Sequence, residues 1–305
     1  MKKNSLSNLF DAEDQEEMAF SKKVLIFDGH NLAYRNVFGA VNKMPEDNDK
    51  FLYWKHLMVS SLFAAIKKYE PDRVVLAFDT KGSWRYKVYP QYKANRKDLK
   101  NKAVVNFEKF YKALETFKHE IMDVFPNIYV VDVEASESDD IIAVLVQDVF
   151  KANTEVIVIS SDKDFNQLLT YPNVKQYDPI RGAMVKCLNP KKELMIKIIS
   201  GDKSDNILPI KTRVGKATAE KILKQGLDSF LKSDEQINEN FKRNSILIDF
   251  SYIPMEIRKA IINNYTQQKP GEIDGTKLMN FFTRNRLVKH MDDWAKYQKY
   301  VKRLS

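Results

Sequence analysis

The 305-residue sequence contains a single cysteine, Cys187. One cysteine excludes an internal disulfide and a cysteine-based zinc module, and it fits a reducing compartment. Histidine is also scarce. The four histidines show no zinc-type spacing and no H-E-x-x-H motif; they are His30, His56, His119 and His290. These absences argue against a zinc enzyme and against a disulfide scaffold.

The sequence lacks any uncharged apolar run near the roughly 20 residues that a membrane span needs. Its N-terminus, MKKNSLSNLFDAEDQEE, has no signal-peptide core. We therefore expect a soluble, cytoplasmic protein without membrane contacts. A content of 44% apolar and 11% aromatic residues excludes wholesale disorder, and the length suits one large domain or two modest ones.

Positive charge exceeds negative charge, with 50 Lys and Arg against 41 Asp and Glu. The excess is concentrated at 81–102, where eight cations and four aromatic residues occur with one acid, Asp98. Cations neutralise phosphates and aromatic rings stack on unpaired bases, so this segment suits a nucleic-acid strand. A solvated basic loop whose aromatics pack on the core fits the composition equally well. We predict that the segment is mobile without DNA, because a basic segment with no acidic partner repels itself.

Short runs rich in Val, Ile and Leu alternate with helical patterns up to residue 190. The predicted strands span 24–28, 73–79, 128–133, 155–160 and 174–177, and the helices between them span 51–69, 103–124, 138–151 and 164–170. Further helices are predicted at 191–200, 216–225, 254–267 and 275–290. The pattern predicts an α/β domain at 21–190 with a largely parallel central sheet flanked by helices. A smaller helical domain at 191–305 and an acidic, flexible tail at 1–20 complete the expected organisation.

Acidic residues follow the predicted strands where each strand ends, and two more lie in a later turn. The nine acids are Asp28, Asp79, Glu137, Asp139, Asp140, Asp162, Asp164, Asp202 and Asp205. Ligands of open α/β sheets bind beyond the carboxyl ends of the strands. So many carboxylates in one cleft would repel one another unless cations were bound between them. Hard divalent ions prefer oxygen ligands, and a two-metal site suits phosphodiester hydrolysis.

Each acid taken alone has a structural explanation. Ser136 with Asp139 fits a capping box, Asp164 could cap the following helix, and Asp205 could close an Asx turn. The metal hypothesis therefore depends on the convergence of all nine acids. Phosphate-binding loops offer no alternative, because VGKAT at 214–218 departs from the P-loop pattern and no G-x-G-x-x-G follows a predicted strand.

Six ordered segments carry a resemblance to a known family. They are FDGHNLAYR (27–35), VVLAFD (74–79), YKANR (92–96), ESDDIIAVL (137–145), SSDKDFNQLL (160–169) and GDKSDN (201–206). Together they resemble the 5′-nuclease superfamily (PIN-like fold), which contains flap endonucleases and the 5′-nuclease domain of bacterial DNA polymerase I. Within it, the chain is most similar to the ribonuclease H enzymes of T-even-like phages, which implies the host cytoplasm as its location.

The resemblance implies roles for individual residues. Asp28, Asp79, Glu137, Asp139 and Asp140 would serve a first divalent ion, and Asp162, Asp164, Asp202 and Asp205 a second. The ions would be Mg²⁺, with Mn²⁺ as a substitute. Lys93 and Arg96 match the catalytic basic pair of a helical arch at 81–102. Tyr92 is a candidate base-stacking residue, and Arg85 and Lys87 are further nucleic-acid contacts.

The segment at 206–225 departs from the family pattern. Relatives carry a hairpin of the type G-[IV]-G-x-K-T-A, which grips the duplex backbone and a potassium ion. Here Arg213 replaces the first glycine, Gly215 keeps the second, and the lysine is displaced to Lys216. We expect these three residues to contact duplex DNA, and the changed pattern puts K⁺ binding in doubt.

The N-terminal segment SLSNLF at 5–10 resembles the short peptides that dock on sliding clamps, although a disordered tail explains it as well. A single-stranded-DNA-binding protein is another partner to consider, and we expect a monomer.

The sequence therefore predicts a magnesium-dependent 5′→3′ exonuclease and flap endonuclease with ribonuclease H activity. It would remove RNA primers during replication, acting on RNA–DNA and DNA–DNA duplexes with 5′ ends, nicks or flaps. Two alternatives stay open at this point. One is a PIN-type single-strand ribonuclease, and the other is a non-catalytic, structure-specific DNA-binding protein.

Overall fold

A single six-stranded sheet forms the centre of the protein. The computed structural model describes residues 20–41, 43, 47–96 and 105–304. The strands are β1 (Lys22–Asp28), β2 (Arg73–Ala77), β3 (Ile128–Val131), β4 (Thr154–Ile159), β5 (Val174–Asp178) and β6 (Ala183–Met184). Their spatial order is β3-β2-β1-β4-β5-β6; β1 to β5 are parallel to one another, and β6 pairs with β5 in the antiparallel direction. The predicted α/β class with a largely parallel sheet is confirmed.

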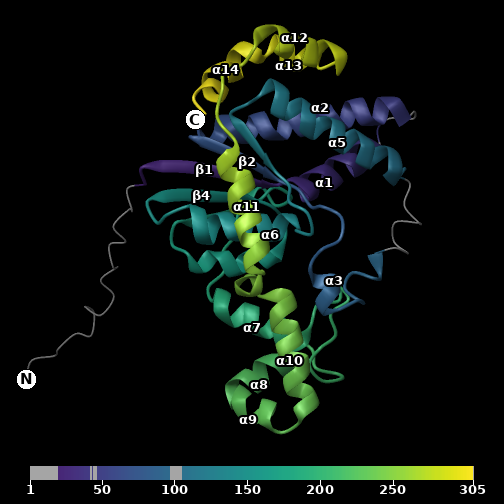
Figure 1. The fold of residues 1–305 in the computed structure, drawn as a ribbon, viewed down its shortest axis with the longest axis vertical. Coiled ribbons are helices and arrows are strands. Elements are labelled where there is room, and N and C mark those ends of the chain that lie inside the picture. Colours follow the sequence, from purple (N-terminus) through teal and green to yellow (C-terminus); the bar gives the residue numbers. More distant parts are fainter. Residues whose placement is uncertain (1–19, 42, 44–46, 97–104, 305) are drawn as a thin grey trace, which may run out of the picture.

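Helices cover both faces of this sheet (Figure 1). One face carries α1 (Gly29–Val41), α2 (Asp47–Tyr69) and α5 (Phe107–Val124). The other face carries α6 (Ser138–Val144), which continues as a π-helical turn η1 (Leu145–Val149), together with the 3₁₀ helix η2 (Lys163–Thr170) and α11 (Met255–Gln267). Side chains of β1 alternate between the two layers: Leu25 and Phe27 face one, and Val24 and Ile26 face the other.

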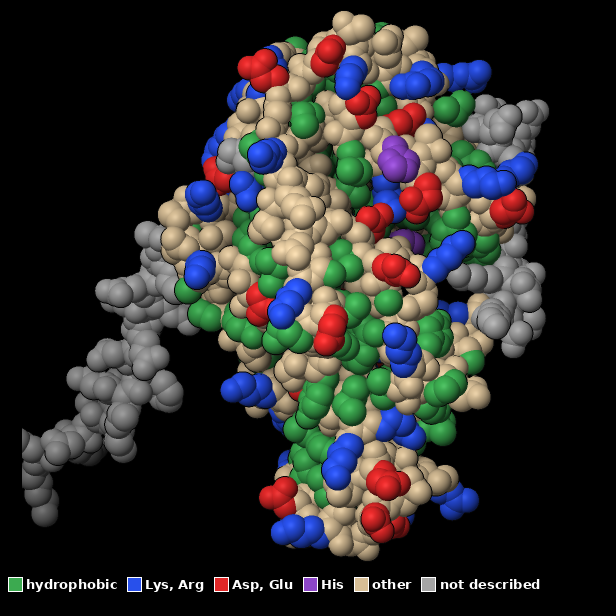
Figure 2. Space-filling model, viewed as in Figure 1, with side chains coloured by type: hydrophobic (Ala, Val, Ile, Leu, Met, Phe, Trp, Pro, Cys, Tyr) green, Lys and Arg blue, Asp and Glu red, His purple; other side chains and the backbone are tan. Residues whose placement is uncertain are grey.

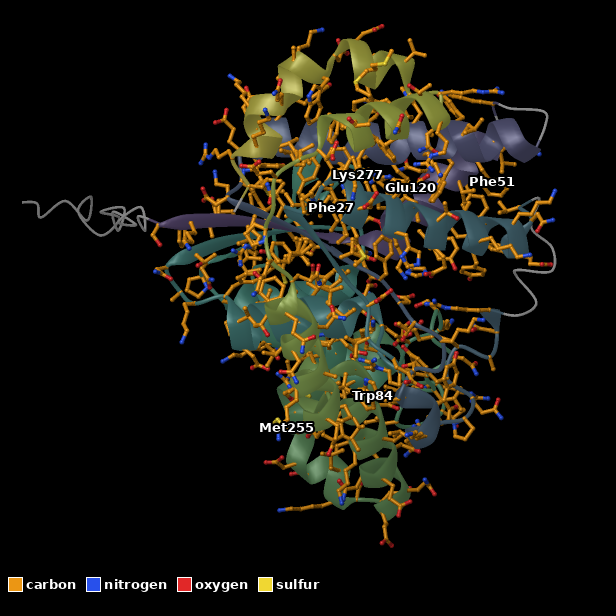
Figure 3. All side chains as sticks on the ribbon, turned by 45° about the horizontal axis from the view of Figure 1, so that its top comes forward. Phe27, Phe51, Trp84, Glu120, Met255 and Lys277 are labelled. Atoms are coloured by element: carbon orange, nitrogen blue, oxygen red, sulfur yellow. The ribbon has the colours of Figure 1, made fainter. Side chains whose placement is uncertain are left out.

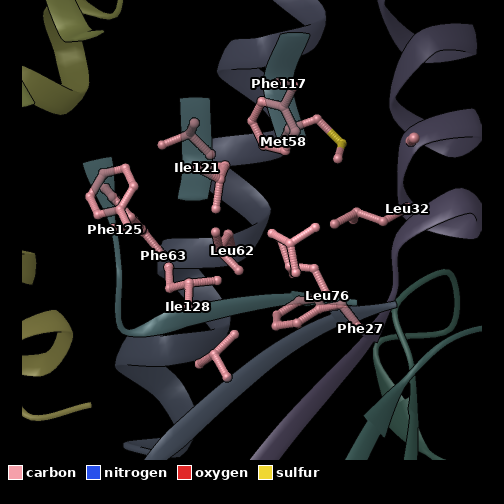
Figure 4. Packing of buried hydrophobic residues seen from close by; sticks show 14 of the residues in the cluster. Phe27, Leu32, Met58, Leu62, Phe63, Leu76, Phe117, Ile121, Phe125 and Ile128 are labelled. Carbon is pink, nitrogen blue, oxygen red and sulfur yellow. The ribbon is translucent and has the colours of Figure 1, made fainter. Parts of the chain in front are cut away.

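Burial on both faces explains why the strand sequences read as continuous apolar runs. Figure 4 shows the first layer, where Phe27 and Leu76 of the sheet belong to one cluster with Leu62 of α2 and Phe117 of α5. The sheet is therefore held rigidly, and the loops at the carboxyl ends of its strands begin from fixed positions.

A smaller helical group lies at the lower end of the molecule in Figure 1. It contains α7 (Pro190–Ser200), α8 (Lys216–Gln225), α9 (Leu227–Lys232) and α10 (Glu235–Ile248), followed by the short 3₁₀ helix η3 (Phe250–Tyr252). Ile199, Ile210 and Ile222 belong to its separate apolar cluster. The short helix α3 (Arg85–Val88) packs against α10.

The last three helices return to the sheet. They are α12 (Gly275–Arg284), α13 (Val288–Asp292) and α14 (Trp294–Lys302). Phe281 and Phe282 join the cluster formed by α2 and α5. Glu120 and Lys277 mark where α5 and α12 lie beside each other (Figure 3), and Lys277 Nζ pairs with Asp123 at 2.6 Å. The division into domains at residue 190 stays a prediction, and residues 275–304 pack with the sheet layer rather than with α7–α10.

The structure also bears on two expectations, the lack of a membrane span and a positively charged surface for nucleic acid. None of the helices in the described part of the chain is long and apolar enough to cross a membrane. On the face shown in Figure 2, Lys and Arg side chains are spread from the upper to the lower end with acids among them. The positive charge on that face is therefore not gathered into one patch.

Candidate metal centre and nucleic-acid interface

The sheet brings the predicted acids together at the carboxyl ends of its strands. Asp28 is the last residue of β1, and Asp79 lies two residues beyond β2. Glu137, Asp139 and Asp140 follow β3 at the start of α6, and Asp162 and Asp164 follow β4 at the start of η2. Because β3, β2, β1 and β4 are adjacent, these acids share one edge, and the turn after α7 adds Asp202 and Asp205.

Asp28 is the buried centre of the first group. Its carboxylate accepts hydrogen bonds from Ser160 Oγ (2.9 Å), Ser138 Oγ (3.1 Å) and the backbone N–H of Asn31 (3.1 Å). The backbone N–H of Ser138 donates to Asp79 Oδ1 at 2.7 Å. Burial, followed by the charge of Asp79, raises the pKa of Asp28 to about 7. Burial would raise the pKa of Asp79, but His30 and Lys93 lower it, so the shortage of positive charge falls on Asp28.

Asp139 links this group to the acids after β4. Burial and the charges of Asp162 and Asp28 raise the pKa of Asp139 well above its usual range. A bound cation would remove this repulsion. The donor set, which consists only of carboxylate oxygens, therefore fits a divalent ion with oxygen ligands.

A second group forms where α7 meets the following turn. One oxygen from each of Asp164, Asp202 and Asp205 lies within 4.8 Å of the others. Lys197 Nζ contacts Asp164 and lies 2.7 Å from Asp202 Oδ2. Burial would lower the pKa of Lys197, but the two carboxylates raise it. The ammonium group of Lys197 thus supplies the positive charge between Asp164 and Asp202 in this structure.

Asp140, which the resemblance assigns to the first metal, is paired with a buried cation in this structure. Its side chain is fully buried and pairs with Arg85, with 2.8 Å between Arg85 Nη2 and Asp140 Oδ1. Trp84 Nε1 (3.1 Å) and the backbone N–H of Glu137 (3.0 Å) donate to Oδ2. In this structure the carboxylate is thus a partner of Arg85, and its assignment to the first metal stays a prediction.

Arg85 and Tyr92 also lie elsewhere than expected. The Arg85 side chain is only 3% exposed; its guanidinium pairs with Glu137 (3.0 Å), and Nε donates to Leu247 O (2.9 Å). The Tyr92 hydroxyl donates to Glu137 Oε2 (2.9 Å) and lies 3.1 Å from Asp205 Oδ2. Neither side chain is accessible for stacking or for phosphate contact in this arrangement. Trp84, labelled in Figure 3, packs in the same cluster as α6 and α11.

The two cationic side chains predicted to be catalytic, Lys93 and Arg96, do lie beside the acids. Lys93 Nζ contacts Glu137 Oε1, and Arg96 Nη2 lies 2.6 Å from Asp205 Oδ1. Lys93 and Arg85 lower the pKa of Glu137, against the opposing effect of burial. The expectation that 81–102 lacks acidic partners is therefore wrong for its described part, residues 81–96. Residues 97–102 lie outside the described residues, and Lys87 is exposed on α3.

The hairpin segment presents its cations to solvent. Gly215 is the N-cap of α8, and Arg213 and Lys216 on either side of it are exposed. Val214 and Ala219 pack into the apolar cluster of the helical group. This geometry is compatible with a duplex contact, which stays a prediction.

Some of the acids do cap helices or close turns, but they are not the residues expected from the sequence. The capping box of α6 pairs Glu137 with Asp140 rather than Ser136 with Asp139. Asp162 rather than Asp164 caps η2, and Asp202 rather than Asp205 accepts from a backbone N–H two residues later. These caps do not exclude a metal site, because one carboxylate can serve both.

Sequence reasoning missed the groups that orient and neutralise the acids. Ser138 and Ser160 hold Asp28, and Lys197 pairs with Asp164 and Asp202. The two serines stand next to the acidic motifs, which is a usable signal. Lys197 lies one helical turn before the glycine of GDKSDN, and no local pattern distinguishes it from the lysines around it.

Fold and site together define a nuclease-type α/β protein, with an acidic site suited to divalent cations at the carboxyl edge of its sheet. Residues 23–197 match the family described as "5'-3' exonuclease, N-terminal resolvase-like domain", and residues 217–297 match "T4 RNase H, C terminal". The chain therefore belongs to the 5′-3′ exonuclease family, which includes flap endonucleases.

Individual relatives agree with this assignment. Ribonuclease H of Enterobacteria phage T4 is 32% identical over 237 residues, covering 70% of this chain and 77% of the relative. The T5 5′-exonuclease with bound divalent zinc ions has a TM-score of 0.65 at 19% identity, covering 81% of this chain and 99% of the other. A variant of the T5 D15 flap endonuclease, in a pseudo-enzyme-product complex with DNA and metal ions, has a TM-score of 0.61 at 21% identity, covering 81% and 100%. The chain spans about a quarter of the length of its DNA polymerase I relatives.

Proposed function

We propose that this chain is a divalent-metal-dependent 5′→3′ nuclease that cuts RNA–DNA and DNA–DNA duplexes at 5′ ends and flaps, and that it removes RNA primers during DNA replication. The observation that carries the proposal is the convergence of acids from four strand ends and one turn on a single site, with Lys93 and Arg96 beside them. The similarity to T4 ribonuclease H, and to a T5 enzyme studied with DNA and metal ions, supports it.

The acids divide into two candidate metal positions. Asp28, Asp79, Glu137 and Asp139 would hold one ion, with Asp140, which pairs with Arg85 in this structure, as a further candidate. Asp162, Asp164, Asp202 and Asp205 would hold the other. Mg²⁺ is the ion we propose, with Mn²⁺ as a substitute, because every donor is a carboxylate oxygen. Such ions supply an activated water nucleophile and stabilise the leaving oxygen of a phosphodiester.

The residues of the chain itself bind and orient the substrate. Lys93 and Arg96 would offset the charge that develops on the scissile phosphate. Arg213 and Lys216, on either side of Gly215, would hold the duplex backbone, with residues 21–190 carrying the chemistry and 191–305 contributing this grip. Contacts with a single-stranded-DNA-binding protein or a sliding clamp stay predictions, and the clamp-like segment at 5–10 lies outside the described residues.

One assay separates this proposal from its alternatives. The substrates are a 5′-labelled flap, a nicked RNA–DNA duplex and a single-stranded RNA, each incubated with Mg²⁺ or with EDTA. We expect Mg²⁺-dependent cleavage of the flap and of the hybrid. Cleavage of only the single-stranded RNA would favour a PIN-type ribonuclease, and binding without any cleavage would favour a non-catalytic DNA-binding protein.

A charge-neutral substitution tests the metal position. Asp139→Asn should abolish cleavage and leave DNA affinity largely intact, because it removes a ligand without adding bulk. Asp292→Asn changes an exposed acid on α13 and serves as the control. Normal turnover of Asp139→Asn would exclude the proposed site. Lys93→Ala should lower kcat more than it weakens binding, whereas a loss confined to binding would assign Lys93 to steering.

A further inference from the structure

The segment that carries Lys93 and Arg96 has an unusual backbone. After α3 ends at Val88, residues 90–95 form successive turns, and Lys93 adopts a left-handed conformation with φ of +53°. The left-handed conformation costs a residue with a β-carbon about 1–2 kcal/mol of conformational energy, so surrounding contacts must hold Lys93 there. These contacts decide where the two cationic side chains lie.

The contacts come from the turn at 201–206. The backbone N–H of Lys93 donates to Asp205 O (2.8 Å), and Asn95 Nδ2 donates to Lys203 O (3.0 Å). In the other direction, Asn206 Nδ2 donates to Gln91 O at 2.7 Å, two residues before Lys93. The turn that supplies Asp202 and Asp205 therefore also supports the segment that carries Lys93 and Arg96.

Asn206 is suited to this contact by its own backbone. It adopts φ of +57°, a region that asparagine tolerates better than most residues with a side chain. The turn is closed independently of the Asn206 side chain, by paired hydrogen bonds between Asp202 and Ile207 of 2.9 and 2.7 Å. The Asn206 amide can therefore serve the neighbouring segment without opening its own turn.

We propose that Asn206 is a positioning residue that acts through Lys93 by fixing the backbone at Gln91. This inference rests on the proposed function of Lys93 in phosphate recognition. A shift of about 1 Å in a positioned group can lower a rate by up to about a hundredfold. Loss of one anchoring hydrogen bond out of three should therefore lower kcat by about tenfold, with little change in KM, since the duplex grip lies elsewhere.

The discriminating variant is Asn206→Gly. Glycine keeps the left-handed conformation without strain and removes only the amide, so the melting temperature should stay within about 3 °C of the unmodified protein. Glu70→Gly is the matched control, because Glu70 also has a positive φ, of +46°, and its exposed side chain directly follows α2.

A double-mutant cycle with Lys93→Ala, measured by single-turnover cleavage of the flap substrate, tests whether Asn206 acts through Lys93. We expect Asn206→Gly to slow cleavage about tenfold in the unmodified protein and less than about twofold in the Lys93→Ala background. Equal slowing in both backgrounds would overturn the inference. Absence of cleavage by the unmodified protein would instead refute the proposed function.

Amide hydrogen exchange tests the same contact without any activity. In metal-free Asn206→Gly, peptides covering 89–96 should exchange at least about tenfold faster, whereas Glu70→Gly should leave them unchanged. Unaltered exchange in 89–96 of Asn206→Gly would show that the hydrogen bond to Gln91 does not hold the segment, and the inference would fail.

Discussion

Replacement of Arg85 by methionine tests whether this buried cation serves the fold rather than the nucleic acid. The guanidinium pairs with Asp140 and with Glu137, and Glu137 has Lys93 as a second cationic partner. In Arg85→Met, Glu137 keeps Lys93, but Asp140 keeps only neutral donors in a fully buried position. Removing one partner of a buried ion pair costs about 3–5 kcal/mol. We expect a loss of unfolding free energy in this range, because methionine retains most of the apolar stem.

Urea denaturation in EDTA measures this loss, with Lys87→Met on the exposed side of α3 as the control. The control should change the unfolding free energy by less than about 0.5 kcal/mol. Adding Asp140→Asn to Arg85→Met should restore part of the stability, because the uncompensated charge disappears. A loss below about 1 kcal/mol in Arg85→Met, or a weaker salt dependence of DNA binding in the folded variant, would refute the reasoning and return Arg85 to the nucleic-acid interface.

Three further predictions concern stability. Tyr92→Phe removes a hydroxyl that donates to the Glu137 carboxylate and should lower the unfolding free energy in urea by about 2 kcal/mol; an unchanged value would mean that water replaces the bond. Gly29→Ala would place a β-carbon 2.5 Å from the Phe78 ring and 2.7 Å from the backbone oxygen of Ala77, so we expect thermal melts to show a loss of about 1–3 kcal/mol in unfolding free energy; a stable variant would show that both the ring and the β2 backbone can move. Mg²⁺ should raise the melting temperature relative to EDTA, because binding at 100 times its Kd adds about 2.7 kcal/mol to the unfolding free energy. Asp139→Asn should reduce this rise, and equal rises in both proteins would place the ion elsewhere.

The sheet could be predicted because its strands carry their own signal. Continuous apolar runs such as VLIFD become β1, and their burial on both faces is what makes them recognisable. The helices α1, α10 and α14 were not predicted. FDGHNLAYR was interpreted as a functional motif, although α1 starts at Gly29 directly after Asp28. The return of α12–α14 to the sheet depends on contacts of Phe281 and Phe282 with distant residues, which no local pattern specifies.

The candidate site was predictable in its acids but not in their partners. Strand ends align at one sheet edge by topology alone, so Asp28, Asp79 and Asp162 could be placed together from their sequence positions. The pairing of Arg85 with Asp140 depends on how α3 docks between α6 and α10, which is a tertiary property. For the same reason Tyr92, an aromatic in a basic segment, was expected at the surface and instead lies against two carboxylates.

This difference changes how the charge of the segment at 81–96 is understood. Composition suggested a division in which acids serve the metals and bases serve the nucleic acid. In the structure these cations pair with the acids directly. Arg85 pairs with Glu137 and Asp140, Lys93 contacts Glu137, and Arg96 pairs with Asp205. Arg85 is buried and pairs with two carboxylates, whereas the Arg96 side chain is 46% exposed and pairs with a single carboxylate. The same stretch of basic sequence therefore contains a buried cation and a partly exposed one, which we propose meets the substrate, and burial rather than composition separates the two.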